Sequence, residues 1–251
     1  MTNATLAPPL TSAKELSEAL RTQGYVVASA ETVAEISGAD LAKLQNLNQF
    51  WKGLPRDPYL KDGGRYRSRR HASYEIKGGH LHLAPHRAHW QSVDYNALHG
   101  GIERWFEPIQ AALLNDPAWQ SVLLGLAQVL NSLKPVSTWF VEAHQFRIDT
   151  ADGIGRPTPE GAHRDGVDFV AVFLLDRIGI KGGETRIFDT SGSAGLRFTL
   201  AQPWSVLLMN DERMIHESTP IQPLGDYGYR DTLVLTYRSN GFQDSPNRSQ
   251  Q

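Results

Sequence analysis

The sequence contains no cysteine among its 251 residues. Without thiols the chain forms no disulfide, zinc ribbon or iron–sulfur cluster, and it has no thiol nucleophile. An excess of charge of one sign is also lacking, because 25 Lys and Arg stand against 27 Asp and Glu, a formal net charge of −2. This balance gives no support for nucleic acid or a membrane surface as a partner.

Long apolar runs are missing as well. The run through residues 170–175 is far too short to span a bilayer. The first nine residues have neither the basic segment nor the apolar stretch of a signal peptide. Hydrophobic residues make up 40% of the chain and charged residues 21%, values typical of a globular protein with an ordinary core. We therefore expect a soluble, cytoplasmic protein.

No low-complexity linker or internal repeat divides the chain, so we expect a single domain over residues 1–251. Its two halves differ in pattern, with a helical N-terminal half at about 13–134 and a β core at about 136–240. A strand is predicted at 25–28. The spacing of apolar residues and the capping pair Asp116 and Pro117 predict helices over residues 13–21, 37–51, 94–114 and 117–134.

After Pro135 the apolar residues alternate, as they do in strands. Strands are predicted at 138–148, 167–175, 185–188, 196–200, 205–209 and 230–238. Many short strands without intervening helices favour a sandwich, barrel or jelly roll over a parallel α/β sheet. The fold class we expect is mainly β, with the helices of the first half packed on the outside of the β core.

The segment His163-Arg-Asp165 is the first candidate for chemistry. In an extended strand residues i and i+2 point to one side, so an imidazole and a carboxylate would converge. Taken alone, the segment is also compatible with a polar edge beside a turn. Downstream, however, His216 follows a glycine turn at 182–185, and Arg230 follows His216 by fourteen residues. Two imidazoles and one carboxylate form the facial triad of non-haem Fe(II) oxygenases, which leaves three metal positions open.

Arg230 fits a second need of that chemistry. A 2-oxo diacid that chelates iron at one end has a free carboxylate at the other, and a guanidinium binds a carboxylate with two parallel hydrogen bonds. Thr232 shares the strand face of Arg230 and offers a hydroxyl to the same carboxylate. The alternative is a solvated arginine at a strand end. Arg238 is the next candidate on the same face.

The ordered set from His163 to Tyr237 resembles the Fe(II)/2-oxoglutarate-dependent oxygenases. Within them it is most similar to the bacterial free-amino-acid hydroxylases of the isoleucine-4-hydroxylase type. The superfamily pattern covers about the last hundred residues, and the closer match extends more thinly over most of the chain. Its motifs are His163-Arg-Asp-Gly-Val-Asp-Phe-Val, Gly182-Gly-Glu-Thr, His216-Glu-Ser-Thr-Pro-Ile, Tyr229-Arg-Asp-Thr-Leu and the arginine-rich stretch Arg65–Arg70.

The resemblance implies a double-stranded β-helix of jelly-roll, cupin-like type. It also implies Fe(II) bound by His163, Asp165 and His216, 2-oxoglutarate held at Arg230, and O2 as oxidant. The expected reaction is hydroxylation of a C–H bond of a small L-amino acid or derivative, and Asp165 argues against a halogenase variant. Two alternatives stay open: an oxygenase of another small molecule or of a protein side chain, and a non-catalytic cupin-like binding module. A homodimer is also left open.

The arginine-rich stretch raises the question of substrate binding. Arg65, Arg67 and Arg69 alternate, so in a strand they share one face. One interpretation is a solvated basic edge that discourages strand pairing. The other, taken mainly from the resemblance, is that Arg67 binds the substrate's carboxylate, with Tyr74 as a companion.

A rival metal site is the histidine-rich segment at 80–89. His80 and His82 share a strand face if the segment is extended, and His86 and His89 follow. The segment has no carboxylate of its own and is interrupted by Pro85, so surface or supporting histidines are the favoured interpretation. Gln145 and Arg147 receive no role, because a long insertion separates their strand from His163.

Overall fold

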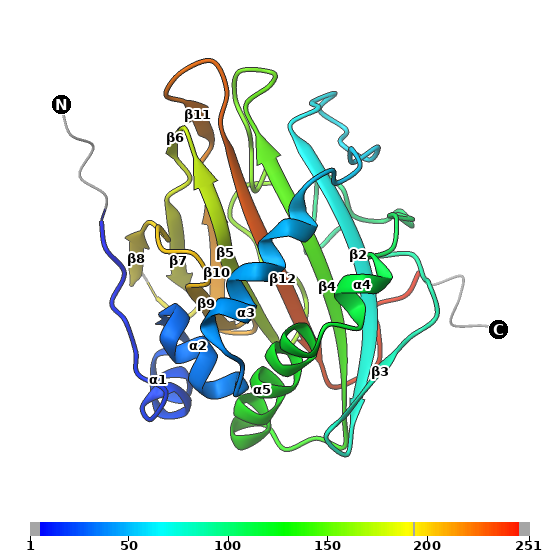
Figure 1. Cartoon of the computed structure of the whole chain (residues 1–251), viewed down its shortest axis with the longest axis vertical. Helices are drawn as coiled ribbons and strands as arrows, with labels where there is room; N and C mark the ends of the chain where they lie inside the picture. The colour runs from blue at the N-terminus through cyan, green and yellow to red at the C-terminus, as the bar shows by residue number, and fades with distance from the viewer. Residues whose placement is uncertain (1–5, 193, 246–251) are drawn as a thin grey trace.

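The computed structural model describes residues 6–192 and 194–245. Its centre is a seven-stranded antiparallel sheet, in which the strands follow the order β1-β9-β5-β12-β4-β2-β3 (Figure 1). The strands are β1 (Tyr25–Ala28), β2 (Arg67–Lys77), β3 (His80–Leu83), β4 (Thr138–Asp149), β5 (Phe169–Ile178), β9 (Val206–Asn210) and β12 (Tyr229–Arg238). Apart from the hairpin of β2 and β3, neighbouring strands are far apart in sequence, as in a jelly roll.

Two small sheets complete the β core. A three-stranded sheet has the order β10-β7-β8 and a two-stranded sheet pairs β11 with β6. Their bounds are β6 (Ile180–Gly182), β7 (Thr185–Asp189), β8 (Gly195–Phe198), β10 (Met214–Ser218) and β11 (Ile221–Pro223). The mainly β fold class with a jelly-roll core is confirmed.

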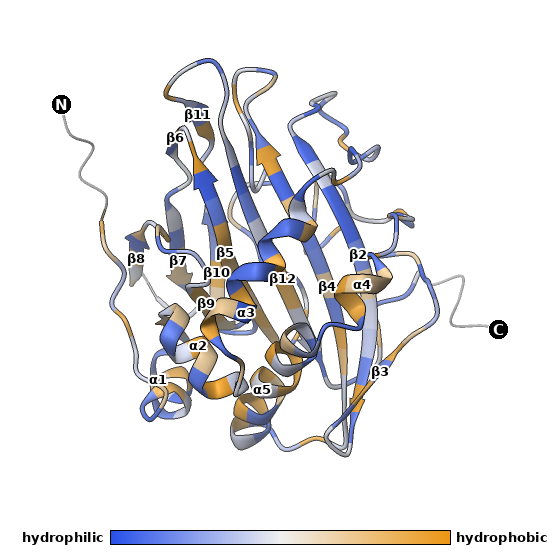
Figure 2. Ribbon diagram, viewed as in Figure 1, coloured by the Kyte–Doolittle hydropathy of each residue, from blue (hydrophilic) through white to orange (hydrophobic). Residues whose placement is uncertain are grey.

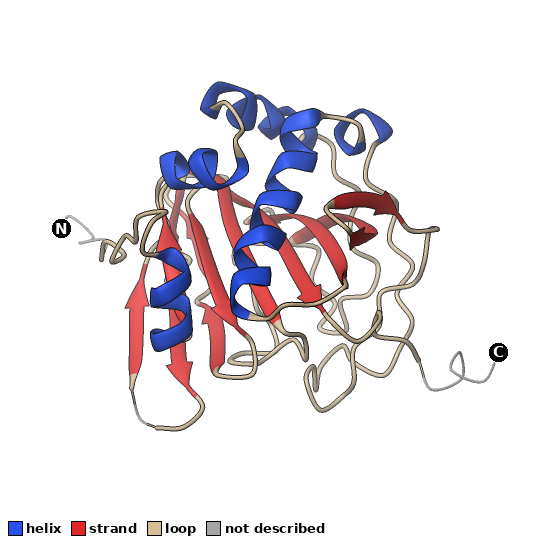
Figure 3. Cartoon of the chain, turned by 90° about the horizontal axis from the view of Figure 1, so that it is seen from below, coloured by secondary structure: helices blue, strands red, loops and turns tan. Residues whose placement is uncertain are grey.

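Helices cover one face of the large sheet (Figure 3). They are α1 (Leu16–Gln23), α2 (Ala30–Ser37), α3 (Leu41–Asn46), a 3-10 turn η1 (Leu47–Trp51), α4 (Ala111–Leu114) and α5 (Pro117–Leu133). The helix α5 begins as predicted, with the Asp116 side chain accepting a hydrogen bond from the backbone of Ala118 and with Pro117 at the first position. None of the described helices is both long and apolar enough to cross a membrane.

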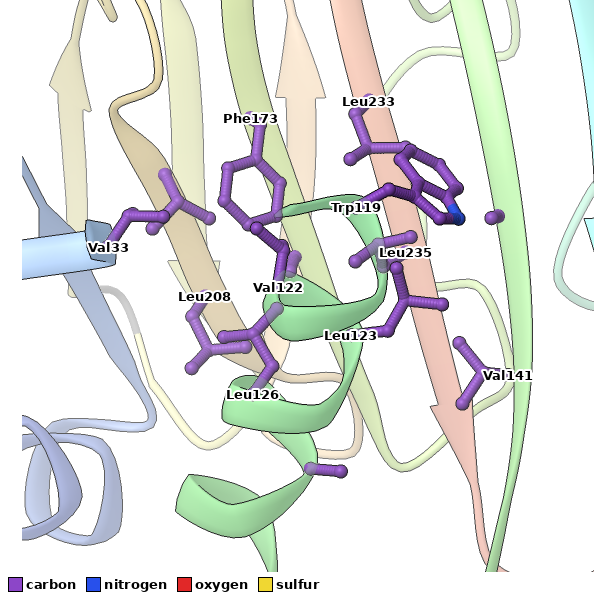
Figure 4. Packing of buried hydrophobic residues seen from close by; sticks show 14 of the residues in the cluster. Val33, Trp119, Val122, Leu123, Leu126, Val141, Phe173, Leu208, Leu233 and Leu235 are labelled. Atoms are coloured by element: carbon purple, nitrogen blue, oxygen red, sulfur yellow. The ribbon is translucent and has the colours of Figure 1, made fainter. Parts of the chain in front are cut away.

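The apolar side of α5 forms the main core with the sheet. Trp119, Val122 and Leu126 pack against strand residues such as Phe173 and Leu235 (Figure 4). Hydrophobic residues accordingly concentrate where α2 and α5 lie on the strands (Figure 2). At Gly125 a Cβ atom would lie 2.6 Å from the carbonyl oxygen of Ile36, so glycine permits the close contact between α5 and α2.

The same strands present polar residues on their other face. On β12, Leu233 and Leu235 belong to the helix-covered core, whereas Arg230, Thr232 and Thr236 point to the inside of the jelly roll. This alternation follows from the two-residue period of a strand. Polar residues are thereby placed inside the jelly roll, next to a second, smaller hydrophobic cluster that includes Leu174 and Leu207.

Two predictions for the first half are wrong. Residues 94–110 are irregular, and only Ala111–Leu114 of the predicted 94–114 helix is helical. Gly101 adopts a left-handed conformation, and Arg104 forms an antiparallel β-bridge with His89. Both features are incompatible with a helix over this segment. The first half is also less helical than expected, because β2 pairs with β4 over its whole length.

Candidate active site

A cavity of about 130 Å³ lies inside the jelly roll. Its walls are the polar faces of β2, β4 and β12, the strand β10, and the loops around residues 91–104 and 157–167. The predicted iron ligands and the predicted anchor of 2-oxoglutarate all line this one cavity.

His163, Asp165 and His216 converge on one point of the cavity wall. The two imidazole Nε2 atoms are 3.3 Å apart, and the Asp165 carboxylate lies 3.4 Å from Nε2 of His216 and 3.8 Å from that of His163. Two ligands at right angles about a metal with bonds of about 2.1 Å are roughly 3 Å apart. The three side chains therefore fit one face of an octahedral iron site if their ligand atoms move slightly closer together.

Backbone pairing and hydrogen bonds hold these ligands. His163 and His216 face each other across an antiparallel bridge, with N–H to carbonyl distances of 3.0 and 2.9 Å. Nδ1 of His163 donates to the carbonyl oxygen of Gly161 at 2.9 Å, which leaves Nε2 free to bind a metal. Gln91 donates to Oδ1 of Asp165 at 3.1 Å. These backbone and side-chain hydrogen bonds thus orient the ligand atoms.

Asp211 fixes the turn that carries Asp165. Its carboxylate accepts the backbone N–H groups of residues 165, 166 and 167 at 2.9, 2.7 and 3.0 Å. Burial lowers the pKa of His216 well below its usual value, and the nearby His163 adds to this effect. A neutral imidazole is the form that binds a metal.

Arg230 is buried at the cavity wall, and Thr232 lies beside it on the same strand face. Nη2 of Arg230 has no hydrogen-bond partner among the described residues. Burial, together with the neighbouring Arg177, lowers the pKa of Arg230 to about 10, so the group stays charged at neutral pH. Arg238 instead donates to the carbonyl oxygen of Gly241 and does not line the cavity.

Arg67 reaches the same cavity from β2. Its Nε atom donates to Asp57 at 2.7 Å, and its Nη2 atom has no partner among the described residues. Arg67 and Arg230 are both opposite Ile148 of β4, one on either side. Their strands are two strand spacings apart, roughly 10 Å. Two arginines therefore line the cavity from the same sheet, at the same level and on either side of Ile148.

The solvated-edge interpretation of the arginine stretch is wrong for Arg67 and Arg69, which are buried. The guanidinium of Arg69 lies between the rings of Phe106 and Phe146, 3.7 and 4.3 Å from their centroids. Arg65 precedes the strand and forms an exposed ion pair with Asp152.

The predicted substrate role of Tyr74 is wrong. Tyr74 lies seven residues after Arg67 on β2, so its side chain points to the opposite face of the strand. There it is buried in the helix-covered core, and its hydroxyl accepts a hydrogen bond from Nε1 of Trp119 at 2.9 Å. It does not line the cavity.

The histidine-rich segment at 80–89 does not form a metal site of its own. His80 and His82 are exposed residues of β3, and His86 bonds to the carbonyl oxygen of Phe106. His89 alone turns inward, where it joins a buried group that the sequence pattern did not predict. The other members of this group are His71, Glu142 and His144.

This four-residue group also has a donor set that fits iron. In the structure Glu142 accepts from Nε2 of His71 at 3.2 Å and from Nδ1 of His89 at 3.1 Å. Arg69 donates to Nδ1 of His144 at 2.6 Å, which places the ring proton of a neutral His144 on Nε2. Burial lowers the pKa of all three histidines. The group is therefore hydrogen-bonded within itself as neutral imidazoles around one carboxylate.

Gln145 and Arg147 lie outside the cavity, on the other face of β4. Gln145 donates to the carbonyl oxygen of Phe50, and Arg147 forms two hydrogen bonds with Asp231 at 2.7 and 2.6 Å. Both residues support the sheet. In contrast, Arg104 and Glu160 line the cavity from loops. The sequence wrongly predicted a helix around Arg104, and it gave no periodic signal around Glu160.

Comparisons with known proteins agree with this site. A family model described as 2OG-Fe dioxygenase matches residues 48–236, about three quarters of the chain. The solved structure of a bsmA homolog from Methylobium petroleophilum PM1 is 47% identical, with a TM-score of 0.90, and the match covers 95% of this chain and 98% of that chain. No curated protein matches the sequence.

Two more distant solved structures share the fold. IDO from Bacillus thuringiensis is 19% identical with a TM-score of 0.74, over 93% of this chain and 100% of that chain. The Fe(II)/α-ketoglutarate-dependent dioxygenase TqaL is 18% identical with a TM-score of 0.67, over 90% and 86%. Because the family model spans most of the cavity-forming strands, the chain belongs to the 2OG-Fe dioxygenase family.

Proposed function

We propose that this enzyme hydroxylates a C–H bond of a small L-amino acid or a close derivative. The 2OG-Fe dioxygenase family uses Fe(II), 2-oxoglutarate and O2. One observation carries the choice of substrate: Arg67 and Arg230 are both buried in one cavity, and each has an unpartnered N–H group among the described residues. Two separated cations suit two acids, the co-substrate and a substrate that carries its own carboxylate.

For the metal we propose His163, Asp165 and His216 as ligands. Their ligand atoms converge, whereas in the group around Glu142 both carboxylate oxygens already accept hydrogen bonds from His71 and His89, and Arg69 donates to His144. The guanidinium of Arg69 beside that second group also opposes binding of a cation. When bound at the triad, iron would supply the activation of O2, coupled to oxidative decarboxylation of 2-oxoglutarate.

For 2-oxoglutarate we propose Arg230 as the anchor of the distal carboxylate, with Thr232 as a second donor. The Arg230 guanidinium keeps its charge when buried, and the carboxylate satisfies the N–H group that has no partner among the described residues. Two strands away, Asp57 orients Arg67 through Nε and leaves Nη2 for the substrate's carboxylate. The protein thus binds both acids and orients them toward the triad.

The dimensions of the cavity favour a small substrate over a protein side chain. Ligand pockets usually have several hundred Å³, and the volume of about 130 Å³ lies below that range. The two buried arginines also disfavour a peptide substrate, because an internal residue of a peptide has no free α-carboxylate to pair with the second guanidinium.

Anaerobic reconstitution followed by a substrate panel tests the proposal. With Fe(II) and 2-oxoglutarate we expect a weak visible charge-transfer band that neither the acid nor the metal alone produces. Admission of O2 with a panel of aliphatic L-amino acids should then increase succinate release for at least one member, with a hydroxylated product. Absence of stimulation by every amino acid, with the band intact, would refute the substrate class while leaving the cofactor assignment.

A further inference from the structure

Glu160 is an acidic side chain that the proposed reaction does not use. It lies in the loop between β4 and β5, lines the cavity, and has a side chain only 11% exposed. One carboxylate oxygen, Oε1, is 3.5 Å from Nε2 of His163. The other, Oε2, is buried and has no hydrogen-bond partner among the described residues. A buried acceptor left without a donor is costly, and this position calls for a ligand that donates.

Unpartnered donors face the same part of the cavity. Nη2 of Arg67 and Nε of Arg104 have no partners among the described residues. Arg104 is held by a 2.9 Å hydrogen bond from its Nη2 atom to Gln91. Neither arginine forms an ion pair with Glu160 within 4.0 Å. Glu160 is nevertheless near enough to raise the pKa of Arg104, against the larger lowering that burial causes. Positive and negative groups are thus kept apart within one small space.

We propose that Glu160 binds the α-ammonium group of the substrate through Oε2, while Arg67 and Arg104 hold its α-carboxylate. This inference rests on the proposed function and narrows it to substrates with a free amino group beside the acid. The ammonium group has three N–H donors, and Oε2 of Glu160 is an acceptor without a donor among the described residues. With the ammonium and carboxylate groups both fixed and the substrate's side chain directed to the triad, three groups on the Cα atom have defined positions. Such a site distinguishes an L- from a D-amino acid.

Other carboxylates in the cavity are less suited to this role. Both oxygens of Glu142 already accept from His71 and His89, and Glu217 forms an ion pair with Arg186. Glu160 as a fourth metal ligand is the main rival. Four protein ligands would leave two positions on an octahedral metal, and a bidentate 2-oxo acid would occupy both, with none left for O2.

The test compares amino acids with matched 2-hydroxy acids. L-Isoleucine, L-leucine, L-valine and L-methionine are each paired with the analogue in which a hydroxyl replaces the ammonium group, and kcat/KM is measured by succinate release. The wild-type enzyme should prefer its best amino acid over the matched hydroxy acid by at least about tenfold. In Glu160→Gln the shape is kept but the charge is lost, so this preference should disappear through a rise in KM for the amino acid.

Glu217→Gln is the matched control, because it removes a cavity-lining carboxylate that already has a partner. It should keep the wild-type preference. Anaerobic titration of the charge-transfer band provides a readout independent of turnover, and Glu160→Gln should bind Fe(II) and 2-oxoglutarate as the wild type does. Weaker Fe(II) binding in Glu160→Gln, with equal losses for both substrate series, would overturn the proposal in favour of a metal ligand.

Two further outcomes separate this inference from the proposed function. If amino acids stimulate the wild type and Glu160→Gln keeps the tenfold preference, the ammonium site is wrong and the function stands. If no amino acid stimulates the wild type, or the hydroxy acids are preferred, both are wrong.

Discussion

Replacement of Arg230 by Ala removes a buried guanidinium whose Nη2 atom has no partner among the described residues. The proposed partner is the distal carboxylate of 2-oxoglutarate. If that carboxylate enters the cavity of the variant, Thr232 is left as its neighbouring donor on the strand. The co-substrate would then place a charge in a buried site without a counter-charge.

The size of the effect follows from the hydrogen bonds that the guanidinium would donate to this carboxylate. A hydrogen bond to a charged group contributes about 1.5–3 kcal/mol, and each 1.36 kcal/mol corresponds to about a factor of ten. Removal of one such bond therefore weakens 2-oxoglutarate binding by about tenfold to a hundredfold, and removal of a pair of parallel bonds weakens it by more. Arg230→Lys should recover only part, because an ammonium is a point charge without the planar fork.

The assay is an anaerobic titration of Fe(II)-loaded protein with 2-oxoglutarate, followed through the charge-transfer band. Arg238→Ala is the control, since Arg238 has the same strand face as Arg230 but bonds to Gly241 outside the cavity. Thermal unfolding without 2-oxoglutarate serves as a folding check. Burial lowers the pKa of Arg230, which means that the fold disfavours this charge, so its removal should leave the Ala variant folded and show as a loss of 2-oxoglutarate binding.

An unchanged affinity in Arg230→Ala would refute the reasoning. The nearby Arg177, which donates to the carbonyl oxygen of Gly182 at 2.7 Å, would then be the next anchor to test. Equal losses of affinity in the Arg230 and Arg238 variants would instead indicate a general effect on the strand.

Three other predictions concern the metal, the substrate and the pH. His163→Ala and His216→Ala should each reduce iron below one atom per chain, whereas Glu142→Gln should keep it; elemental analysis after anaerobic reconstitution decides between the two groups. Arg67→Ala should raise the amino-acid KM steeply and leave the uncoupled decarboxylation of 2-oxoglutarate unchanged; loss of both would show that Arg67 supports the fold or the metal site. Burial lowers the pKa of His89 to about 3. Below pH 6.5 this histidine is therefore protonated in the unfolded chain but not in the folded chain. The free energy of unfolding should then decrease by up to about 1.4 kcal/mol for each unit by which the pH falls. Thermal unfolding of His89→Asn should show a shallower fall between pH 6.5 and 5, and an identical slope would contradict this origin.

Features that depend on short-range periodicity were predictable from the sequence. Arg230 and Thr232 share a cavity wall because residues two apart in a strand point to the same side. His163 and Asp165 also converge, but here the cause is different: His163 forms a β-bridge with His216, and Asp165 lies in the turn that precedes β5. The same rule could have corrected the prediction for Tyr74, which is an odd number of residues from Arg67.

Features that depend on pairing between distant strands were not predictable. Glu142 and His71 meet only because β4 and β2 pair antiparallel in a register that places Ser73 opposite Glu142 and His71 opposite His144. The two-residue alternation on each strand was visible, but nothing local specifies which residue of one strand lies opposite which residue of the other. The apolar spacing in 94–114 was misleading for a related reason. Of its apolar residues, Ile109 and Leu113 are buried in the main core whereas Trp105 is exposed, so they do not form one buried helix face.

The arrangement of the sheet separates the two recognition tasks. Arg230 lies on β12, which is flanked on both sides by long strands, whereas Arg67 lies at the start of β2, near the edge of the sheet. Ile148 of the intervening β4 stands between them and fixes the distance. Substitutions at Arg67, Arg104 or Glu160 can therefore change the substrate without moving the strand that anchors the co-substrate. It also follows that the substrate side is formed largely by segments outside the C-terminal motifs, so those motifs identify the chemistry but do not identify the substrate.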